Sequence, residues 1–263
     1  MIIDGKKIRD EILQELKVSF KSIPEPILAV VWVGADKATE KFIECKKKVA
    51  ENIGVELRLF KYEDSITQEE LEQEIKKLAE SKEVNGIIVQ LPLPKIIVSQ
   101  KILELVPNTK DVDALGLEAI VLSPVVSAVK EILTRYEVSL LGKKFVVIGQ
   151  GKLVGLPVAT WLTHEGAEVI AVDNQTEDII THLRQADVII SGIGKPSFIV
   201  PEMIKDGVVL IDAGTSEQVG KLAGDIDPAC SSKASLFTPV PGGVGPIVLA
   251  KLFQNLLALI KLK

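Results

Sequence analysis

The chain has 263 residues, of which 47% are hydrophobic and 25% are charged, and its formal net charge is -5. This is the composition of a globular protein with room for one large domain or two modest ones, and the acidic balance argues against a nucleic-acid partner. No apolar run reaches the roughly 18 residues of a membrane span and no secretory signal is visible, so we expect a cytoplasmic protein that binds no membrane. Two cysteines, Cys45 and Cys230, favour free thiols and no metal site.

Strand and helix patterns alternate along the chain, which favours an α/β fold with parallel sheets. The first series predicts helices at 5–20, 38–52, 68–81 and 97–105 and strands at 27–33, 56–62 and 86–90. The second series predicts a helix at 124–135, strands at 145–148, 168–172, 187–191, 208–211 and 235–237, and a last helix at 246–261. We therefore predict two domains, residues 1–120 with 245–263 and residues 121–244, with the apolar last helix packed onto the first.

A glycine-rich turn follows the predicted strand at 145–148. Gly149 permits a tight turn, Gly151 lets a pyrophosphate approach the backbone, and Gly155 lets the next helix pack against its strand. Asp173 ends the following strand, where a carboxylate commonly binds the adenosine ribose and repels the extra phosphate of NADP. The pattern predicts a doubly wound Rossmann domain that binds NAD, and a glycine-rich turn in another kind of α/β protein is the alternative.

Lys46 is a candidate for proton chemistry because its face of the predicted helix is otherwise apolar. Phe42, Val49 and Ile53 share that face at helical spacing. A lysine held against apolar groups loses hydration, and its pKa then falls toward a range useful for proton transfer. The alternative is a lysine whose alkyl chain lies at the rim of the core while its ammonium group reaches solvent.

Two more polar residues stand at the ends of predicted elements. Gln90 closes an apolar strand just before two closely spaced prolines, and ligands gather beyond the carboxyl ends of parallel strands. An amide that caps a nearby turn is the alternative. Asp113 lies in a loop, where acids commonly cap turns through backbone contacts. The local sequence leaves a binding role and a structural role open for both residues.

Five further short segments lie along the chain. Two of them lie between the Lys46 helix and the 149–157 loop, and three lie between that loop and the last helix. They are Gly86-Ile-Ile-Val-Gln-Leu-Pro-Leu-Pro94, Lys110-Asp-Val-Asp113, Gly194-Lys-Pro196, Gly224-Asp-Ile-Asp227 and Thr238-Pro-Val-Pro-Gly-Gly-Val-Gly-Pro246. Together they resemble the signatures of the bifunctional methylenetetrahydrofolate dehydrogenase/cyclohydrolase family. The resemblance implies an N-terminal folate-side α/β domain, a Rossmann domain, a folate cleft between them and a homodimer. It also implies oxidation of methylenetetrahydrofolate by a nicotinamide cofactor, followed in most members by hydrolysis of the methenyl product.

The resemblance also implies roles for particular residues. Lys46 is the expected catalytic lysine, Gln90 tunes its protonation, and Asp113 binds the ring and amino N–H donors of the pterin. The residues expected to contact the folate are Phe42, Gln90, Asp113, Pro241, Gly242 and Gly243. The residues expected to contact the cofactor are Gly149, Gln150, Gly151, Lys152, Val154, Gly155, Asp173, Asn174, Gly194 and Thr238.

The cofactor side departs from the family pattern at two pairs of residues. Gln150 and Gly151 replace a usual arginine and serine, and Asp173 and Asn174 replace a usual histidine and serine. Arginine and small hydroxyls suit a 2′-phosphate, whereas glutamine and an ionised aspartate do not. These departures favour NAD over NADP.

The folate side departs at Phe42, where the family nearly always has tyrosine, so that a hydroxyl near Lys46 is lost. The segment between Asp113 and Pro124 is also shorter than usual. Both changes bear on methenyl hydrolysis.

Two rival functions stay open. One is a folate- or dinucleotide-binding sensor or partner protein that has lost turnover, and the other is a dehydrogenase of a different two-domain family. Retention of Lys46, Gln90 and Asp113 together argues against the first, and the folate-side segments argue against the second.

Overall fold

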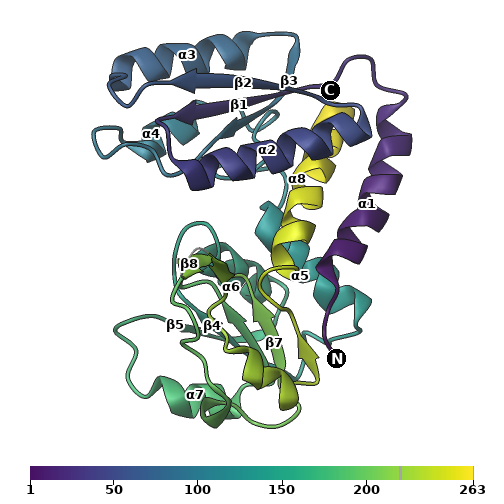
Figure 1. Cartoon of the computed structure of the whole chain (residues 1–263), viewed down its shortest axis with the longest axis vertical. Coiled ribbons are helices and arrows are strands. Elements are labelled where there is room, and N and C mark those ends of the chain that lie inside the picture. Colours follow the sequence, from purple (N-terminus) through teal and green to yellow (C-terminus); the bar gives the residue numbers. More distant parts are fainter. Residues whose placement is uncertain (219–220, 263) are drawn as a thin grey trace. The chain divides into compact units, whose positions relative to one another are not determined.

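The computed structural model describes residues 1–218 and 221–262. The chain divides into two compact units. The three-stranded unit consists of Asp10–Pro124 and Leu249–Lys263, and the five-stranded unit of Met1–Arg9 and Val125–Val248. Each unit holds a parallel sheet accompanied by helices, so the predicted α/β class is confirmed (Figure 1).

The three-stranded unit is built on a parallel sheet in the order β2-β1-β3. All seven residues of the central strand β1 are buried, as a strand covered on both faces requires. Alternate side chains of β1 pack against buried side chains of α3 and α4, which therefore cover one face. The elements are β1 (Ile27–Val33), β2 (Glu56–Tyr62), β3 (Val84–Val89), α3 (Gln68–Glu80) and α4 (Ser99–Glu104).

Helix α8 (Val244–Lys261) packs closely against this sheet. A Cβ on Gly86 of β3 would lie 2.6 Å from a leucine side chain of α8. Asn255 of α8 donates its Nδ2 protons to the carbonyls of Val112 and Leu122, at 2.9 and 2.8 Å. By length and composition α8 could span a membrane, but 56% of that window is buried, as in a core helix. Residues 249–261 of α8 cluster with the three-stranded unit, whereas its first residues cluster with the five-stranded unit.

The five-stranded unit contains a parallel sheet in the order β10-β7-β6-β4-β5. The chain passes from β4 to β5 on one side and then to β6 on the other, which is the doubly wound arrangement. Its strands are β4 (Lys144–Ile148), β5 (Glu168–Val172), β6 (Val188–Ser191), β7 (Val209–Asp212) and β10 (Leu236–Phe237), and a separate antiparallel pair is β8 (Ser216–Gln218) with β9 (Lys221–Ala223). Its helices are α5 (Pro124–Arg135), α6 (Gly155–His164) and α7 (Ile179–Gln185), with short 3-10 turns at Pro201–Met203 and Pro228–Ser232.

The first residues of the chain pair with the edge of the five-stranded sheet. Ile3 N donates to Phe237 O and Phe237 N donates to Met1 O, both at 2.9 Å. Residues 1–9 therefore cluster with the five-stranded unit, whereas the sequence prediction placed them in the other domain. Helix α1 (Gly5–Phe20) begins within this segment. The difference arises because edge pairing depends on a partner more than 230 residues away, which the local pattern does not reveal.

The predicted helices and strands are all present within a few residues of their expected bounds. Helix α7 and the β8–β9 pair were not predicted. Helix α7 has only seven residues and begins after Asp178, whose side chain accepts the N–H of Thr181. A helix of this length is too short to show an apolar period.

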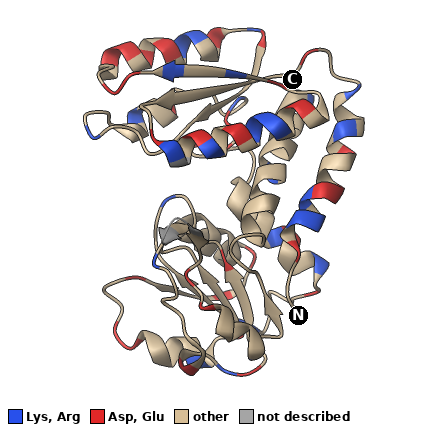
Figure 2. Ribbon diagram, in the orientation of Figure 1, with Lys and Arg blue, Asp and Glu red and all other residues tan. Residues whose placement is uncertain are grey.

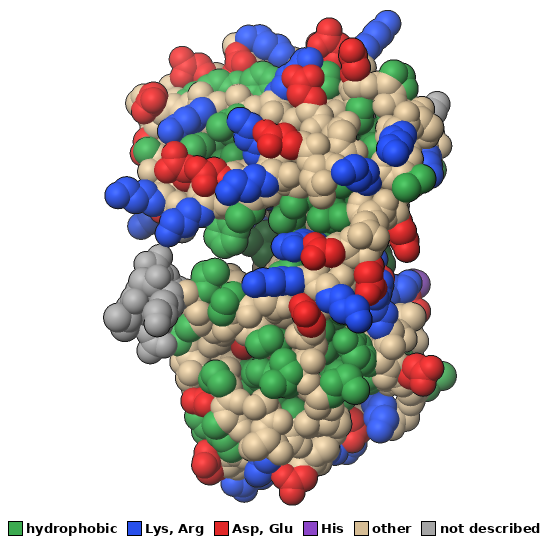
Figure 3. Space-filling model, turned by 45° about the vertical axis from the view of Figure 1, so that its right-hand side comes forward, with side chains coloured by type: hydrophobic (Ala, Val, Ile, Leu, Met, Phe, Trp, Pro, Cys, Tyr) green, Lys and Arg blue, Asp and Glu red, His purple; other side chains and the backbone are tan. Residues whose placement is uncertain are grey.

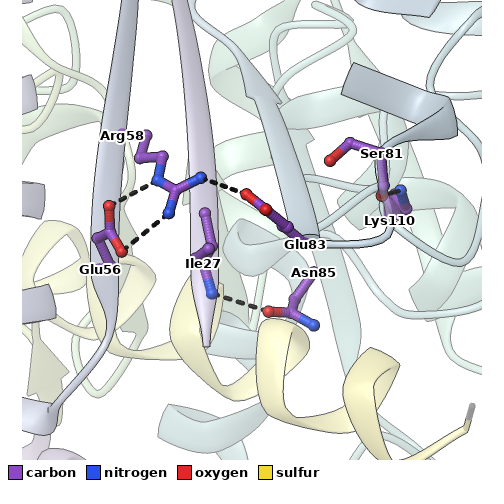
Figure 4. Close-up of polar contacts among 7 residues, drawn as sticks. All are labelled: Ile27, Glu56, Arg58, Ser81, Glu83, Asn85 and Lys110. Carbon is purple, nitrogen blue, oxygen red and sulfur yellow. Dashed lines mark hydrogen bonds and ion pairs between the residues drawn. The ribbon is translucent and has the colours of Figure 1, made fainter. Parts of the chain in front are cut away.

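Charged side chains of both signs alternate along the helices of the three-stranded unit (Figure 2). The face drawn in Figure 3 likewise mixes both signs. On the sheet, Arg58 pairs with Glu56 at 2.6 Å and with Glu83 at 2.9 Å, and the Asn85 side chain accepts the N–H of Ile27 at 2.8 Å (Figure 4). The ion pairs are solvent-exposed and contribute little stability.

Candidate functional site

Helix α2 (Lys37–Ile53) presents Lys46 from the three-stranded unit. It begins after Asp36, whose carboxylate accepts the N–H of Thr39 at 2.7 Å, and ends at Gly54 in the left-handed conformation, with φ 80°. Lys46 is half-buried, whereas the two lysines that follow it are exposed. The helix therefore holds one of three consecutive lysines partly out of water.

The side chains of Lys46 and Gln90 are hydrogen-bonded to each other. Lys46 Nζ donates to Gln90 Oε1 at 2.9 Å, and Gln90 Nε2 donates to Leu91 O at 3.0 Å, so the amide oxygen faces the lysine. Gln90 follows β3, and its main-chain N–H donates to Val31 O at 2.8 Å. Burial lowers the pKa of Lys46, and the charge of Asp113 opposes this effect. The lysine thus has a fixed acceptor and a lowered pKa, both of which suit proton transfer.

Asp113 is presented by an anchored loop. Lys110 is buried, and its ammonium group donates to carbonyls at the end of α3, including Ser81 O at 2.6 Å, beside which Figure 4 shows it. The buried Asp111 carboxylate accepts the N–H of Gly116 at 2.8 Å. Both ends of the turn are fixed by these bonds, so Asp111 serves the loop's own structure, and Asp113 is the carboxylate whose charge acts on Lys46.

The electrostatics of Asp113 and Lys46 are linked. Burial raises the pKa of Asp113, the Lys46 charge lowers it, and the Asp111 charge raises it further. Phe42 lies one helical turn before Lys46, with 48% of its surface exposed. The structure thus brings Lys46, Gln90 and Asp113 together and leaves an exposed aromatic ring beside them.

The glycine-rich turn of the five-stranded unit has the shape of a phosphate cradle. Gly149 has φ 92°, and its N–H donates to Val172 O at 2.7 Å. A Cβ on Gly155 would lie 1.6 Å from Gly149 O, so only glycine fits, whereas a Cβ on Gly151 would meet no atom within 4 Å. Helix α6 begins at Gly155 without a side-chain cap. The open backbone and the helix N-terminus fit the pyrophosphate of a dinucleotide.

The other residues predicted around this turn differ in what they contact. Gln150 folds back, and its Nε2 donates to the carbonyl of the preceding residue at 2.8 Å. Lys152 is exposed, and Val154 packs where a Cβ on Gly192 would lie, 2.3 Å from its side chain. Gly194 follows β6 with φ 68°. Gln150 thus braces the turn and Lys152 reaches solvent.

Asp173 follows β5, which pairs with β4 in the sheet. Its Oδ1 accepts the N–H of Gln175 at 2.9 Å and the hydroxyl of Thr176 at 3.1 Å. Part of the carboxylate therefore shapes its own turn, and Oδ2 is the oxygen suited to a ribose hydroxyl. Asn174 is exposed.

The segment before α8 is backbone-rich and irregular. It contains a cis Val240–Pro241 peptide and Gly242 with φ 108°, and Gly243 N donates to a carbonyl four residues earlier at 2.7 Å. Thr238 is fully buried, and its Oγ1 accepts the N–H of Asp212 at 2.6 Å. Burial and this bond give Thr238 a structural role, and the predicted cofactor contact stays a prediction.

Asn255 and Lys110 were not singled out from the sequence, although they hold the loop that carries Asp113. Asn255 stands in an otherwise apolar helix with only 7% of its surface exposed. A buried amide needs hydrogen-bond partners, so a lone asparagine within an apolar helix was the available signal.

The fold and these residues define a two-unit α/β protein, with a dinucleotide-binding unit and a second unit that carries a lysine-centred polar cluster. Residues 3–113 match the tetrahydrofolate dehydrogenase/cyclohydrolase catalytic domain, and residues 123–263 match the NAD(P)-binding domain of the same family. The chain belongs to the tetrahydrofolate dehydrogenase/cyclohydrolase family, which confirms the resemblance seen in the sequence.

Similar proteins support this assignment along the whole chain. The bifunctional protein FolD of Nautilia profundicola is 38% identical over 97% of this chain and 95% of its own length. The crystal structure of bifunctional FolD from Campylobacter jejuni is 36% identical, with a TM-score of 0.96, and covers 99% of this chain and 98% of that one. The Trypanosoma brucei enzyme, solved with NADP cofactor and an inhibitor, is 32% identical, with a TM-score of 0.92, over 99% and 97% of the two chains.

Proposed function

We propose that the protein oxidises 5,10-methylenetetrahydrofolate to 5,10-methenyltetrahydrofolate with a nicotinamide cofactor, and that it hydrolyses the methenyl product to 10-formyltetrahydrofolate. In this proposal the three-stranded unit is the folate-side domain and the five-stranded unit is the dinucleotide-binding domain. The observation that carries it is the Lys46–Gln90–Asp113 cluster in a chain of this family.

Each residue of the cluster has a task that its contacts support. Asp113 would accept hydrogen bonds from the pterin, for which an ionised carboxylate is a suitable acceptor. Gln90 Oε1 would orient Lys46, and Phe42 would stack on the substrate ring. Lys46 in its neutral form would take a proton from the attacking water during hydrolysis, which a lowered pKa makes accessible.

Oxidation of methylenetetrahydrofolate requires mainly that the substrate and the nicotinamide be positioned for hydride transfer. When bound, the nicotinamide supplies the hydride acceptor. Gly149, Gly151 and Gly155 would form the turn that holds the pyrophosphate, because Gly151 leaves open space where a phosphate approaches and Gly149 and Gly155 allow the close packing of the turn. Pro241 and Gly242 would form a rigid wall of the binding region.

We propose NAD as the preferred cofactor. Asp173 carries negative charge at the position of a ribose contact, and Gln150 is turned back into the loop, so neither offers a positive group to a 2′-phosphate. NADP is the competing outcome, since a relative has been solved with it. We also propose a homodimer, which sedimentation of the purified protein would test.

A spectrophotometric assay tests the proposal. Purified protein is given methylenetetrahydrofolate with NAD or with NADP, and decay of methenyltetrahydrofolate is followed separately. Reduced cofactor formed faster with NAD, together with methenyl decay above the uncatalysed rate, is the expected result. No reduction of either cofactor would overturn the dehydrogenase proposal in favour of a binding protein without turnover.

A further inference from the structure

Two sequence segments, residues 194–196 and 224–227, have no task so far apart from the expected cofactor contact of Gly194, and a hydrogen bond from Lys195 to Asp225 links them. This residue is completely buried. Its Oδ1 accepts the N–H of Lys195, and its Oδ2 accepts the Ser191 hydroxyl and the N–H of Ile193, all at 2.8 Å. One carboxylate therefore holds the loop of residues 192–195 by two bonds and ties it to the end of β6 by a third.

This loop lies where a dinucleotide fold binds its ligand. It follows β6, which pairs with β4 on the side opposite β5, so the strand order reverses between β4 and β6. It also packs against the glycine-rich turn, because a Cβ on Gly149 would lie 2.7 Å from Ile193 Cγ2. The turn after β4 suits the pyrophosphate and the end of β5 suits the adenosine ribose. The loop after β6 is left for the nicotinamide half.

A second buried carboxylate holds Asp225 itself. Asp212, at the end of β7, accepts the N–H groups of Ile226, Gly214 and Asp225 at 2.8, 3.0 and 3.2 Å. Both carboxylates are closely packed against backbone, because a Cβ on Gly214 would lie 2.1 Å from the Asp225 carboxyl carbon and a Cβ on Gly224 would lie 2.2 Å from Asp212 Oδ2. Burial raises the pKa of Asp212 to about 7. Asp212 at the end of β7 thus accepts from the backbone of Asp225, and Asp225 in turn accepts from the backbone of loop 192–195.

We propose that Asp225 is a positioning residue for the nicotinamide half of the cofactor: it fixes the shape of loop 192–195, and Asp212 fixes Asp225. The inference rests on the proposed function. A carboxylate can accept from all three donors at once, whereas an asparagine in the same place would turn an N–H toward the N–H of Lys195. The loop would then lose one anchor and shift, while the pyrophosphate turn keeps its own bonds.

Direct binding tests the inference without turnover. NAD and ADP are titrated by calorimetry into the wild type, Asp225→Asn and the matched control Asp227→Asn, whose carboxylate only caps a short turn through the N–H of Ala229. We expect Asp225→Asn to weaken NAD binding about tenfold, the cost of one unpaired buried donor, and to leave ADP binding unchanged. Asp227→Asn should bind both ligands as the wild type does.

Other outcomes separate the inference from the proposed function. A wild type that binds neither NAD nor NADP would overturn the proposed function and the inference with it. A wild type that binds NAD while Asp225→Asn binds NAD equally well, or loses NAD and ADP to the same extent, would overturn the inference alone. If Asp225→Asn does not fold, Ser191→Ala removes a single bond, and NAD affinity should fall a few-fold with ADP unchanged. Unchanged NAD affinity in that variant would overturn the inference.

Discussion

The candidate site of the three-stranded unit is made of side chains, whereas that of the five-stranded unit is made mainly of backbone. Lys46, Gln90 and Asp113 act through charge, pKa and hydrogen bonds, which one substitution can remove. Gly151 and Gly155 act through the absence of a side chain, which leaves open space at Gly151 and allows a close backbone contact at Gly155. Substitutions in the first site should therefore lower catalytic rates and leave the protein folded. Substitutions in the second should weaken cofactor binding or destabilise the fold, depending on which glycine receives a Cβ.

The largest effect is expected for Lys46→Met. Methenyl hydrolysis should fall by about 10²–10⁴-fold, the usual worth of a general acid or base, because the methionine side chain cannot accept the proton that neutral Lys46 would take. Hydride transfer should fall much less, since it depends on positioning. The two rates are measured separately, with Lys47→Met on the exposed side of α2 as the control. Small and equal losses would leave Lys46 as a lysine at the rim of the core.

Gly155→Ala and Gly151→Ala should separate fold from binding. The first places a Cβ against Gly149 O, so both thermal stability and NAD binding should be lost. The second places its Cβ in open space, so stability should be kept while NAD binding weakens about tenfold. Calorimetric melting and titration give both quantities. Full NAD affinity in Gly151→Ala would contradict the proposed pyrophosphate contact.

Gln90→Glu should shift the pH dependence of hydrolysis. In the proposed function neutral Lys46 is the active form, so the rate should rise with pH through the pKa of Lys46, which burial sets below its ordinary value. A carboxylate in place of the amide favours the ammonium form and should move this limb to higher pH by about 1–3 units. The rate is measured as a function of pH, with Gln100→Glu on α4 as the control. If the pH dependence of the rate did not shift, Lys46 would not be the group that takes the proton.

Asp173→Ser should shift cofactor preference toward NADP. Loss of the carboxylate removes repulsion of the 2′-phosphate, while the serine hydroxyl can still cap the turn, so the ratio of kcat/KM for NAD to that for NADP should fall about tenfold. The nearby exposed Glu177→Ser removes a charge away from the ribose position and should leave the ratio unchanged. A wild-type preference for NADP would contradict the role given to Asp173.

Phe42→Tyr should have the smallest effect. A phenol one helical turn from Lys46 adds a hydrogen-bonding group to the cluster, so hydrolysis should rise a few-fold with hydride transfer unchanged. In the Lys46→Met background the same change should bring no gain, because the added hydroxyl acts through the lysine. A gain in both backgrounds would show that the hydroxyl works independently of Lys46.

The backbone-built site was the easier one to predict from sequence. Gly149, Gly151 and Gly155 lie within a few positions of each other, between a strand and a helix, so their spacing alone indicates a phosphate turn. The polar cluster could not be derived in this way. Lys46, Gln90 and Asp113 lie on a helix, a strand end and a loop, and only the resemblance to a family grouped them before the structure did.

The sequence by itself determined the α/β class, nearly all helices and strands, the glycine-rich turn and the family, because these depend on periodicity and short spacing. Tertiary structure decided the pairing of residues 1–3 with β10 and the hydrogen bond between Lys46 and Gln90. It also decided the hydrogen bonds by which Asn255 and Lys110 fix the loop that carries Asp113. It also decided that Thr238 is buried and that Asp225 holds loop 192–195. Such contacts join residues tens to hundreds of positions apart, and their geometry exists only once the sheets and helices have packed.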